Sequence, residues 1–156
     1  GTLRLFSGRL RVGETDAPTL IRDVKRRIAG QGMVSLLDAP PGTSCSAVEA
    51  VRSVGYTILV TESTPFGLHD LELMVDVMLA MKLRFGVVIN KAVIHDQTVQ
   101  EYCRREAIDV IAEVPYSKDI ARVCARGGIV PDALPETAPL FESILDAVLG
   151  RKEEMV

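Results

Sequence analysis

Four short apolar runs recur along the chain and predict the strands of a sheet. Each run is rich in branched aliphatic residues, is too short for a helix and lacks the polar–apolar alternation of a half-buried strand. Continuous apolar runs of this kind are typical of parallel strands that are buried on both faces. The four runs are MVSLL at 33–37, YTILV at 56–60, FGVVI at 85–89 and DVIAEV at 109–114.

Segments with helical periodicity lie between these runs. Strands that alternate with helices indicate βαβ units, so we expect an α/β fold with a mainly parallel sheet flanked by helices. Upstream, residues 2–13 alternate like an exposed or edge strand pair. The expected helices are 17–30, 46–54, 67–83, 97–107, 117–128 and 135–150.

Length and composition favour one globular domain over residues 1–156, with 47% apolar and 25% charged residues. The net charge of −3 and the 4% aromatic content predict no surface for nucleic acid. No apolar run reaches the roughly 18 residues of a membrane span. No charged-then-apolar signal segment opens the chain. We therefore expect a cytoplasmic protein that binds neither nucleic acid nor membrane.

Three other features invite functional interpretations that we consider weaker. The three cysteines form no C-x-x-C pair, so a disulfide framework, a zinc site or a cluster site is not predicted. The basic run Arg22, Lys25, Arg26 and Arg27 is typical of a solvated helix face rather than of a DNA contact. The last helix carries Glu142 and Asp146 on its polar face, which favours packing on the sheet over membrane binding.

The first candidate site follows the run 33–37. There Asp38 precedes Pro40, Pro41 and Gly42. A carboxylate at the end of a strand can hold a magnesium-bound water, and a glycine after a rigid turn lets a backbone N–H approach a phosphate oxygen. The alternative is that Asp38 merely caps the next helix.

Two further strand ends carry polar residues. After the second run, His69 and Asp70 suggest catalysis, but no nucleophile is paired with them, so a surface or partner contact is the simpler interpretation. After the third run, Asn90 and Lys91 could hydrogen-bond a purine edge and pack over its ring, and Pro115 after the fourth run could wall the same pocket. A polar turn between strand and helix is the alternative.

Together these stretches resemble the MinD/ParA/Mrp group of P-loop ATPases (SIMIBI class), kin to the nitrogenase iron protein. LLDAPPGTSCS at 36–46 resembles the Walker B and switch II segment, and VTESTPFGLHDL at 60–71 resembles the strand and loop that follow it. VVINK at 87–91 and EVPYS at 113–117 resemble the base-binding stretches. The amino-acid sequence of these stretches is most similar to the sequences of the MinD-like branch that carries an inserted ferredoxin module.

The resemblance implies roles for individual residues. It makes Asp38 a catalytic residue that coordinates Mg²⁺ through water, and it gives Gly42 a role in sensing the γ-phosphate. It also implies that ATP or ADP is the cofactor and that the whole protein forms a homodimer. The branch with the ferredoxin module would add a 4Fe-4S cluster, which this chain does not bind. The cofactor-binding residues implied are Pro40, Gly42, Thr43, Asn90, Lys91 and Pro115.

The chain departs from this pattern in one large respect. No Gly-Lys-Ser/Thr sequence occurs in it, and the ferredoxin cysteines are absent. We therefore expect an incomplete fold, the C-terminal part of a larger ATPase, inactive alone. In the resembled fold, the strand before the phosphate loop lies between the strands ending at Asp38 and Thr61. Those two strands should consequently close up on each other or recruit a second copy.

Two functions of other classes remain as alternatives. Asp38, Thr61 and Lys91 end three successive strands in the order used by phosphoacceptor receiver domains. The acidic pair of such domains is missing, and the Pro-Pro-Gly turn fits them poorly. The other alternative is a non-catalytic interaction module that kept the fold and lost the chemistry.

Overall fold

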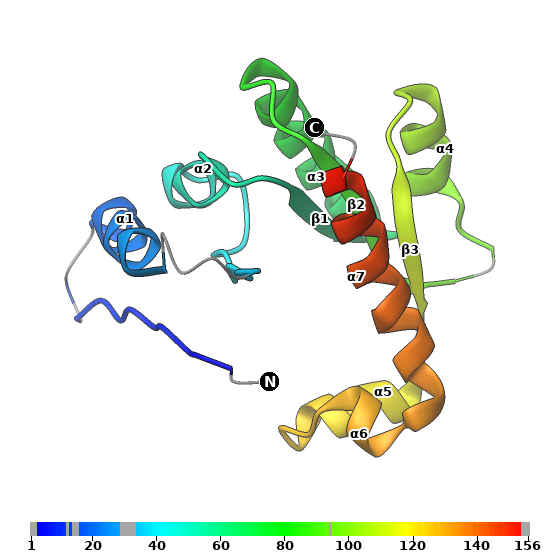
Figure 1. The fold of residues 1–156 in the computed structure, drawn as a ribbon. Coiled ribbons are helices and arrows are strands. Elements are labelled where there is room, and N and C mark those ends of the chain that lie inside the picture. The colour runs from blue at the N-terminus through cyan, green and yellow to red at the C-terminus, as the bar shows by residue number, and fades with distance from the viewer. Residues whose placement is uncertain (1–2, 12, 14–15, 29–33, 94, 154–156) are drawn as a thin grey trace. The chain divides into compact units, whose positions relative to one another are not determined.

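Figure 1 shows the chain as a computed structural model, which describes residues 3–11, 13, 16–28, 34–93 and 95–153. The chain divides into two compact units, residues 1–54 and residues 55–156, and each is described by itself. The expectation of a single domain over residues 1–156 stays a prediction.

The C-terminal unit is built on a parallel sheet. Its strands are β1 (Thr57–Glu62), β2 (Phe85–Ala92) and β3 (Val110–Pro115), in the order β1-β2-β3. The β1–β2 register is continuous from Thr57 opposite Phe85 to Glu62 opposite Asn90. The β2–β3 pairing is interrupted by register shifts, one of them between Ile89 and Ala92. The α/β class and the parallel arrangement of these three predicted strands are confirmed.

Helices connect and cover these strands. The helix α3 packs against β1 and the helix α7 packs against β3. In the described part of the chain, no helix combines the length and the apolar character that crossing a bilayer requires. The helical elements of this unit are α3 (Pro65–Ala80), α4 (Thr98–Arg105), α5 (Lys118–Ala125), α6 (Val130–Ala133), a 3₁₀ turn (Pro135–Thr137) and α7 (Ala138–Glu153).

The core of this unit lies between β2 and the helices α3 and α4. On the central strand β2, the consecutive residues Val87, Val88 and Ile89 are all buried, as expected for a strand covered on both faces. The largest fully buried side chains are Val75, Met78, Val87, Ile89, Val99 and Cys103. Their burial supplies the main stabilising contribution of this unit.

Three helices of the C-terminal unit end in the same way. The residue after each C-cap has a left-handed backbone, with φ of 54° at Lys82, 54° at Ala107 and 71° at Gly127. In each case the next N–H bonds back to the third-last carbonyl of the helix, which is the Schellman motif. The positive φ values at these positions therefore belong to ordinary helix ends.

The N-terminal unit contains two helices, α1 (Ala17–Ile28) and α2 (Cys45–Val51). Asp16 begins α1 by accepting a hydrogen bond from the Thr19 N–H over 3.1 Å. The edge strand pair expected at 2–13 is wrong for the residues described there, 3–11 and 13, since none of them is in a strand. Gly8 instead lies close to α1, where an added Cβ would come within 2.8 Å of Leu20.

The strand predicted at 33–37 is also wrong for the residues that are described. Residues 34–40 have no regular secondary structure, and Val34 and Leu36 are 65% and 91% exposed. Met33 lies outside the described residues. An apolar run becomes a strand only where neighbouring strands pair with its N–H and C=O groups. The sequence of the run does not determine whether such neighbouring strands are present. The predicted pairing of this run with the strand that ends near Thr61 is therefore not seen among the described residues. The recruitment of a second copy of the chain stays a prediction.

Candidate functional site

The carboxyl ends of the three strands meet at one edge of the sheet, because β1, β2 and β3 are parallel. At this edge Glu62 of β1 lies opposite Asn90 of β2, and Ala92 lies opposite Pro115 of β3. The Tyr116 N–H donates to the carbonyl of Ala92 over 3.0 Å. The two stretches predicted to bind a purine base, at the ends of β2 and β3, are therefore neighbours.

An ion pair joins the ends of β1 and β2. Lys91 Nζ lies 2.7 Å from Glu62 Oε1, and both side chains are partly exposed. The hydrogen bond to Glu62 and the negative charge of that carboxylate raise the pKa of Lys91 above its ordinary 10.5. The ion pair thus fixes the Lys91 ammonium beside Glu62 at this edge. Sequence reasoning missed Glu62, for which the only signal was an acidic residue two positions after an apolar run.

Two polar groups at this edge have unused hydrogen-bonding capacity. Asn90 is partly exposed, and its side-chain amide makes no hydrogen bond to any residue that the structure describes. The Ser63 hydroxyl is buried and likewise has no partner among those residues. A partly exposed, unpaired amide is a suitable group to bind the polar edge of a ligand.

The turn from β1 into α3 is tightly organised. Thr64 caps α3, because its hydroxyl oxygen accepts from the Gly67 N–H over 3.0 Å. The Thr61 hydroxyl donates to the Gly67 carbonyl over 2.8 Å. Gly67 approaches the backbone so closely that an added Cβ would lie 2.3 Å from the Glu62 carbonyl oxygen. These contacts fix the direction in which the chain leaves the carboxyl edge beside Glu62.

The predicted phosphate and magnesium residues lie in the N-terminal unit, in the loop that leads into α2. Asp38 and Pro40 are exposed, and Thr43 is partly exposed. Gly42 has a φ of 84°, a backbone conformation that side chains other than glycine rarely adopt. Asp38 does not cap α2, because the N-cap position of that helix is Ser44, whose side chain makes no capping bond. The carboxylate and the glycine turn are thus presented at the surface of this unit.

The other candidate residues take structural or surface roles. His69 and Asp70 are exposed on the first turns of α3. The receiver-type alternative assigned chemistry to Thr61 and Lys91, but the Thr61 hydroxyl is bound to a backbone carbonyl and Lys91 is paired with Glu62. Within the described residues, no group of three or more His, Cys, Asp or Glu side chains could hold a metal ion.

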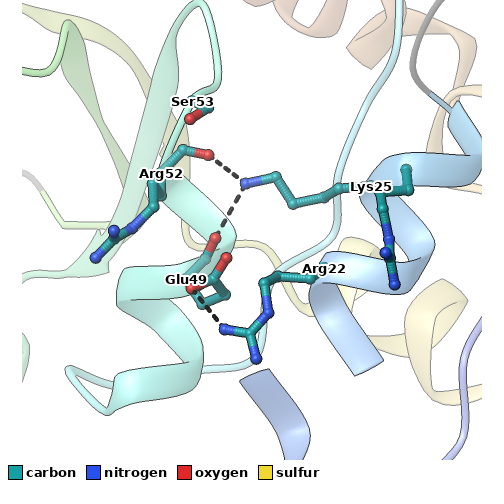
Figure 2. A pocket seen from close by; sticks show the side chains of 6 residues that line it. Arg22, Lys25, Glu49, Arg52 and Ser53 are labelled. Carbon is teal, nitrogen blue, oxygen red and sulfur yellow. Dashed lines mark hydrogen bonds and ion pairs between the residues drawn. The ribbon is translucent and has the colours of Figure 1, made fainter. Parts of the chain in front are cut away.

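A basic cavity of about 280 Å³ lies between α1 and α2 within the N-terminal unit (Figure 2). Its lining residues are Arg22, Lys25, Arg26, Glu49, Arg52 and Ser53. Arg22 pairs with Glu49 over 3.4 Å. Of the basic run, Arg22, Arg26 and Arg27 are exposed, as expected of a solvated helix face, whereas Lys25 is partly buried in the contact between the two helices.

Lys25 is the central residue of this contact. Its ammonium donates to the carbonyls of Glu49 and Ala50, over 3.0 and 3.1 Å, and to the carbonyl of Arg52. Burial lowers the pKa of Lys25, while the charge of Glu49 opposes that shift. These carbonyls lie at the C-terminal end of α2. In a Schellman motif the Val54 N–H would bond to the Glu49 carbonyl, but here it bonds to the Val51 carbonyl instead. With its three donors used in this way, Lys25 stabilises the fold of the unit.

No protein-family model matches the chain. Two curated relatives come from Methanocaldococcus jannaschii: "Uncharacterized protein MJ0579", 24% identical over 79% of this chain, and "Uncharacterized protein MJ0578", 20% identical over 96%. The chain spans about half the length of these relatives, 43% and 51% respectively.

The fold is similar to that of a solved structure. The MinD cell division protein of Aquifex aeolicus superposes with a TM-score of 0.64 and 16% identity, over 90% of this chain and 61% of that protein. A likeness at this level of identity concerns the fold, and it agrees with the three-stranded parallel sheet flanked by helices. The chain therefore has an α/β fold similar to that of the MinD cell division protein.

Proposed function

We propose that this chain is the nucleotide-binding part of a MinD-like ATPase and that the carboxyl edge of β1, β2 and β3 receives the base of ATP or ADP. One observation carries the proposal: Asn90, Lys91 and Pro115, predicted from separate stretches, come together at that edge. In open α/β sheets, ligands bind beyond the carboxyl ends of the strands. The edge also lies in a fold similar to that of the MinD cell division protein.

Each residue at the edge has a chemical property suited to a purine. The unpaired amide of Asn90 offers both a donor and an acceptor, as the edge of adenine requires. Lys91 presents an aliphatic stem that can pack against the ring while its ammonium stays with Glu62. Pro115 and Tyr116 are both exposed and supply apolar surface for the opposite side of the base.

For the N-terminal unit by itself, we propose that the loop before α2 contacts phosphate and Mg²⁺. Mg²⁺ usually keeps several waters and needs only one or two protein carboxylates besides the phosphates, so a single exposed Asp38 fits this ion. The left-handed turn at Gly42 favours close approach of backbone N–H groups to an anion, with Pro40 and Thr43 shaping the same loop. When bound, the ion would neutralise phosphate charge.

We further propose that hydrolysis belongs to a longer protein that acts as a homodimer. The curated relatives are about twice the length of this chain, and no Gly-Lys-Ser/Thr phosphate loop occurs within it. The lysine and hydroxyl of such a loop stabilise the transferring phosphoryl group. Binding of the nucleotide is thus the function proposed for the chain itself.

Binding titrations with Asn90 variants test this proposal. Mg-ATP is titrated into the 156-residue chain and into Asn90→Ala and Asn90→Asp, with heat as the readout. We expect saturable binding that is at least about tenfold weaker in both variants, because each loses the amide donor. Glu106→Ala, at the far end of α4, is the control and should bind like the unaltered chain. Equal affinity in Asn90→Ala would contradict the proposed base site.

A further inference from the structure

Lys91 has a left-handed backbone conformation, although it does not lie at the end of a helix. Four described residues other than glycine have positive φ: Ser53, Lys82, Lys91 and Ala107. The other three directly follow the C-cap of a helix. Lys91, with φ of 53°, instead lies inside β2, next to the register shift between Ile89 and Ala92. Conformations of this kind persist where surrounding contacts enforce them, and they cluster at functional sites.

The contact that holds Lys91 contributes little as a source of stability. Its partner is Glu62, and the two side chains are 56% and 41% exposed. Ion pairs this exposed are screened by water and salt and stabilise a fold only marginally. The pair does, however, fix the position of a long side chain beside Asn90, the residue that lies opposite Glu62 in the β1–β2 register. Its effect is therefore local to the carboxyl edge.

We infer that Glu62 is a positioning residue of the proposed base site: its carboxylate fixes the Lys91 ammonium so that the Lys91 stem forms a wall beside the purine that Asn90 binds. The inference rests on the proposed function, since it assigns Glu62 a role in that same site. Without the carboxylate, the stem samples many rotamers and must be ordered when the ligand binds. Ordering one long side chain weakens affinity by about three- to tenfold.

The test uses adenosine as the probe, because adenosine reports on the base site without phosphate contacts. Its dissociation constant is measured by NMR chemical-shift titration for the 156-residue chain and four variants. These are Glu62→Gln, which removes the charge at constant shape, Glu62→Asp, which keeps the charge, Lys91→Ala, and the double variant Glu62→Gln/Lys91→Ala. The matched control is Glu106→Gln, which breaks the exposed Arg105–Glu106 pair of 2.9 Å at the end of α4.

We expect Glu62→Gln to weaken adenosine binding about three- to tenfold and Glu62→Asp to weaken it less. The control should bind like the unaltered chain. The double variant should bind no more weakly than Lys91→Ala alone, because Glu62 acts only through Lys91. A general loss of structure would instead add to the effect of Lys91→Ala and would lower the melting temperature.

The outcomes separate this inference from the function on which it rests. If adenosine binds the unaltered chain and Glu62→Gln binds equally well, the positioning role is overturned while the base site stands. Additive losses in the double variant overturn it as well. If adenosine shows no saturable binding to the unaltered chain, the proposed base site fails and the inference fails with it. Should Glu62→Gln not fold, Glu62→Asp and its double variant with Lys91→Ala carry the same comparison.

Discussion

Among single residues, Lys91 and Glu62 form the ion pair that joins the ends of β1 and β2 at the candidate site. Glu62 raises the pKa of Lys91 above 10.5, so folding favours the protonated ammonium. A group whose pKa is higher in the folded state contributes stability that is fully present below its unfolded pKa. That contribution is lost as the pH rises through the folded pKa, in the range above 10.5.

The first prediction concerns this titration. The ¹³C shift of Lys91 Cε should titrate with a midpoint above 10.5, and the midpoint should return towards 10.5 in Glu62→Gln. A Lys91 midpoint that does not respond to the loss of the Glu62 charge would show that the pair is not formed in solution.

Gly67 gives a second prediction at this scale. A Cβ at this position would lie 2.3 Å from the backbone oxygen of Glu62, which no side-chain rotation can relieve. Gly67→Ala should therefore lower the free energy of unfolding in urea by about 1–3 kcal/mol. The control Gly150→Ala meets nothing within 4 Å and should be neutral or stabilising by about 0.4–1 kcal/mol. Equal stability of the two variants would contradict the close packing of this turn.

The ends of the helices show how differently the elements of this chain are closed. Three helices end in Schellman motifs formed by their own backbone, whereas Lys25 of α1 satisfies the last carbonyls of α2. An ammonium at a helix C-terminus also interacts favourably with the helix dipole. The helix α2, of 7 residues, is too short to be stable alone, so this contact couples it to α1.

Removal of the Lys25 ammonium should consequently destabilise α2. Lys25→Met keeps the length of the stem but leaves partly buried carbonyls without donors, which costs about 1–3 kcal/mol. Hydrogen exchange of the α2 amides should become faster, by the factor that this loss of free energy predicts for the opening of the helix. Arg26→Met, which alters an exposed side chain of the same cavity, should change stability by no more than about 0.5 kcal/mol. Unchanged exchange in Lys25→Met would refute the capping role.

Sequence patterns predicted the elements whose signal is local. The parallel strands at 56–60, 85–89 and 109–114 follow from short, continuous apolar runs. The run 33–37 has the same pattern but forms no strand, because strand formation depends on neighbours that the pattern does not specify.

Sequence patterns predicted some residues of the candidate site and missed others. Asn90, Lys91 and Pro115 were found because each directly follows a strand run, and the ends of parallel strands share one edge. The partner Glu62 was missed because the pairing depends on the β1–β2 register, which aligns it with Asn90. The role of Lys25 was missed for a similar reason, since its acceptors are about 25 residues away in sequence.

For the molecule as a whole, binding of the nucleotide and its hydrolysis are expected to be separate properties. The purified chain should release phosphate from Mg-ATP at no more than the background rate. Transfer of the phosphoryl group requires the lysine and hydroxyl of a phosphate loop, and no such sequence occurs in these 156 residues. Turnover that disappears in Asp38→Ala would show that this expectation is wrong.

A map of amide chemical shifts tests whether the carboxyl edge of the sheet binds the base of a nucleotide. Mg-ATP is added to the ¹⁵N-labelled chain, and shifts are followed at both ends of β1, β2 and β3. We predict saturable shifts at Glu62, Asn90, Lys91 and Tyr116, and none at the opposite strand ends Thr57, Phe85 and Val110. Shifts confined to the opposite ends, or no saturable shift at the carboxyl edge, would contradict this prediction.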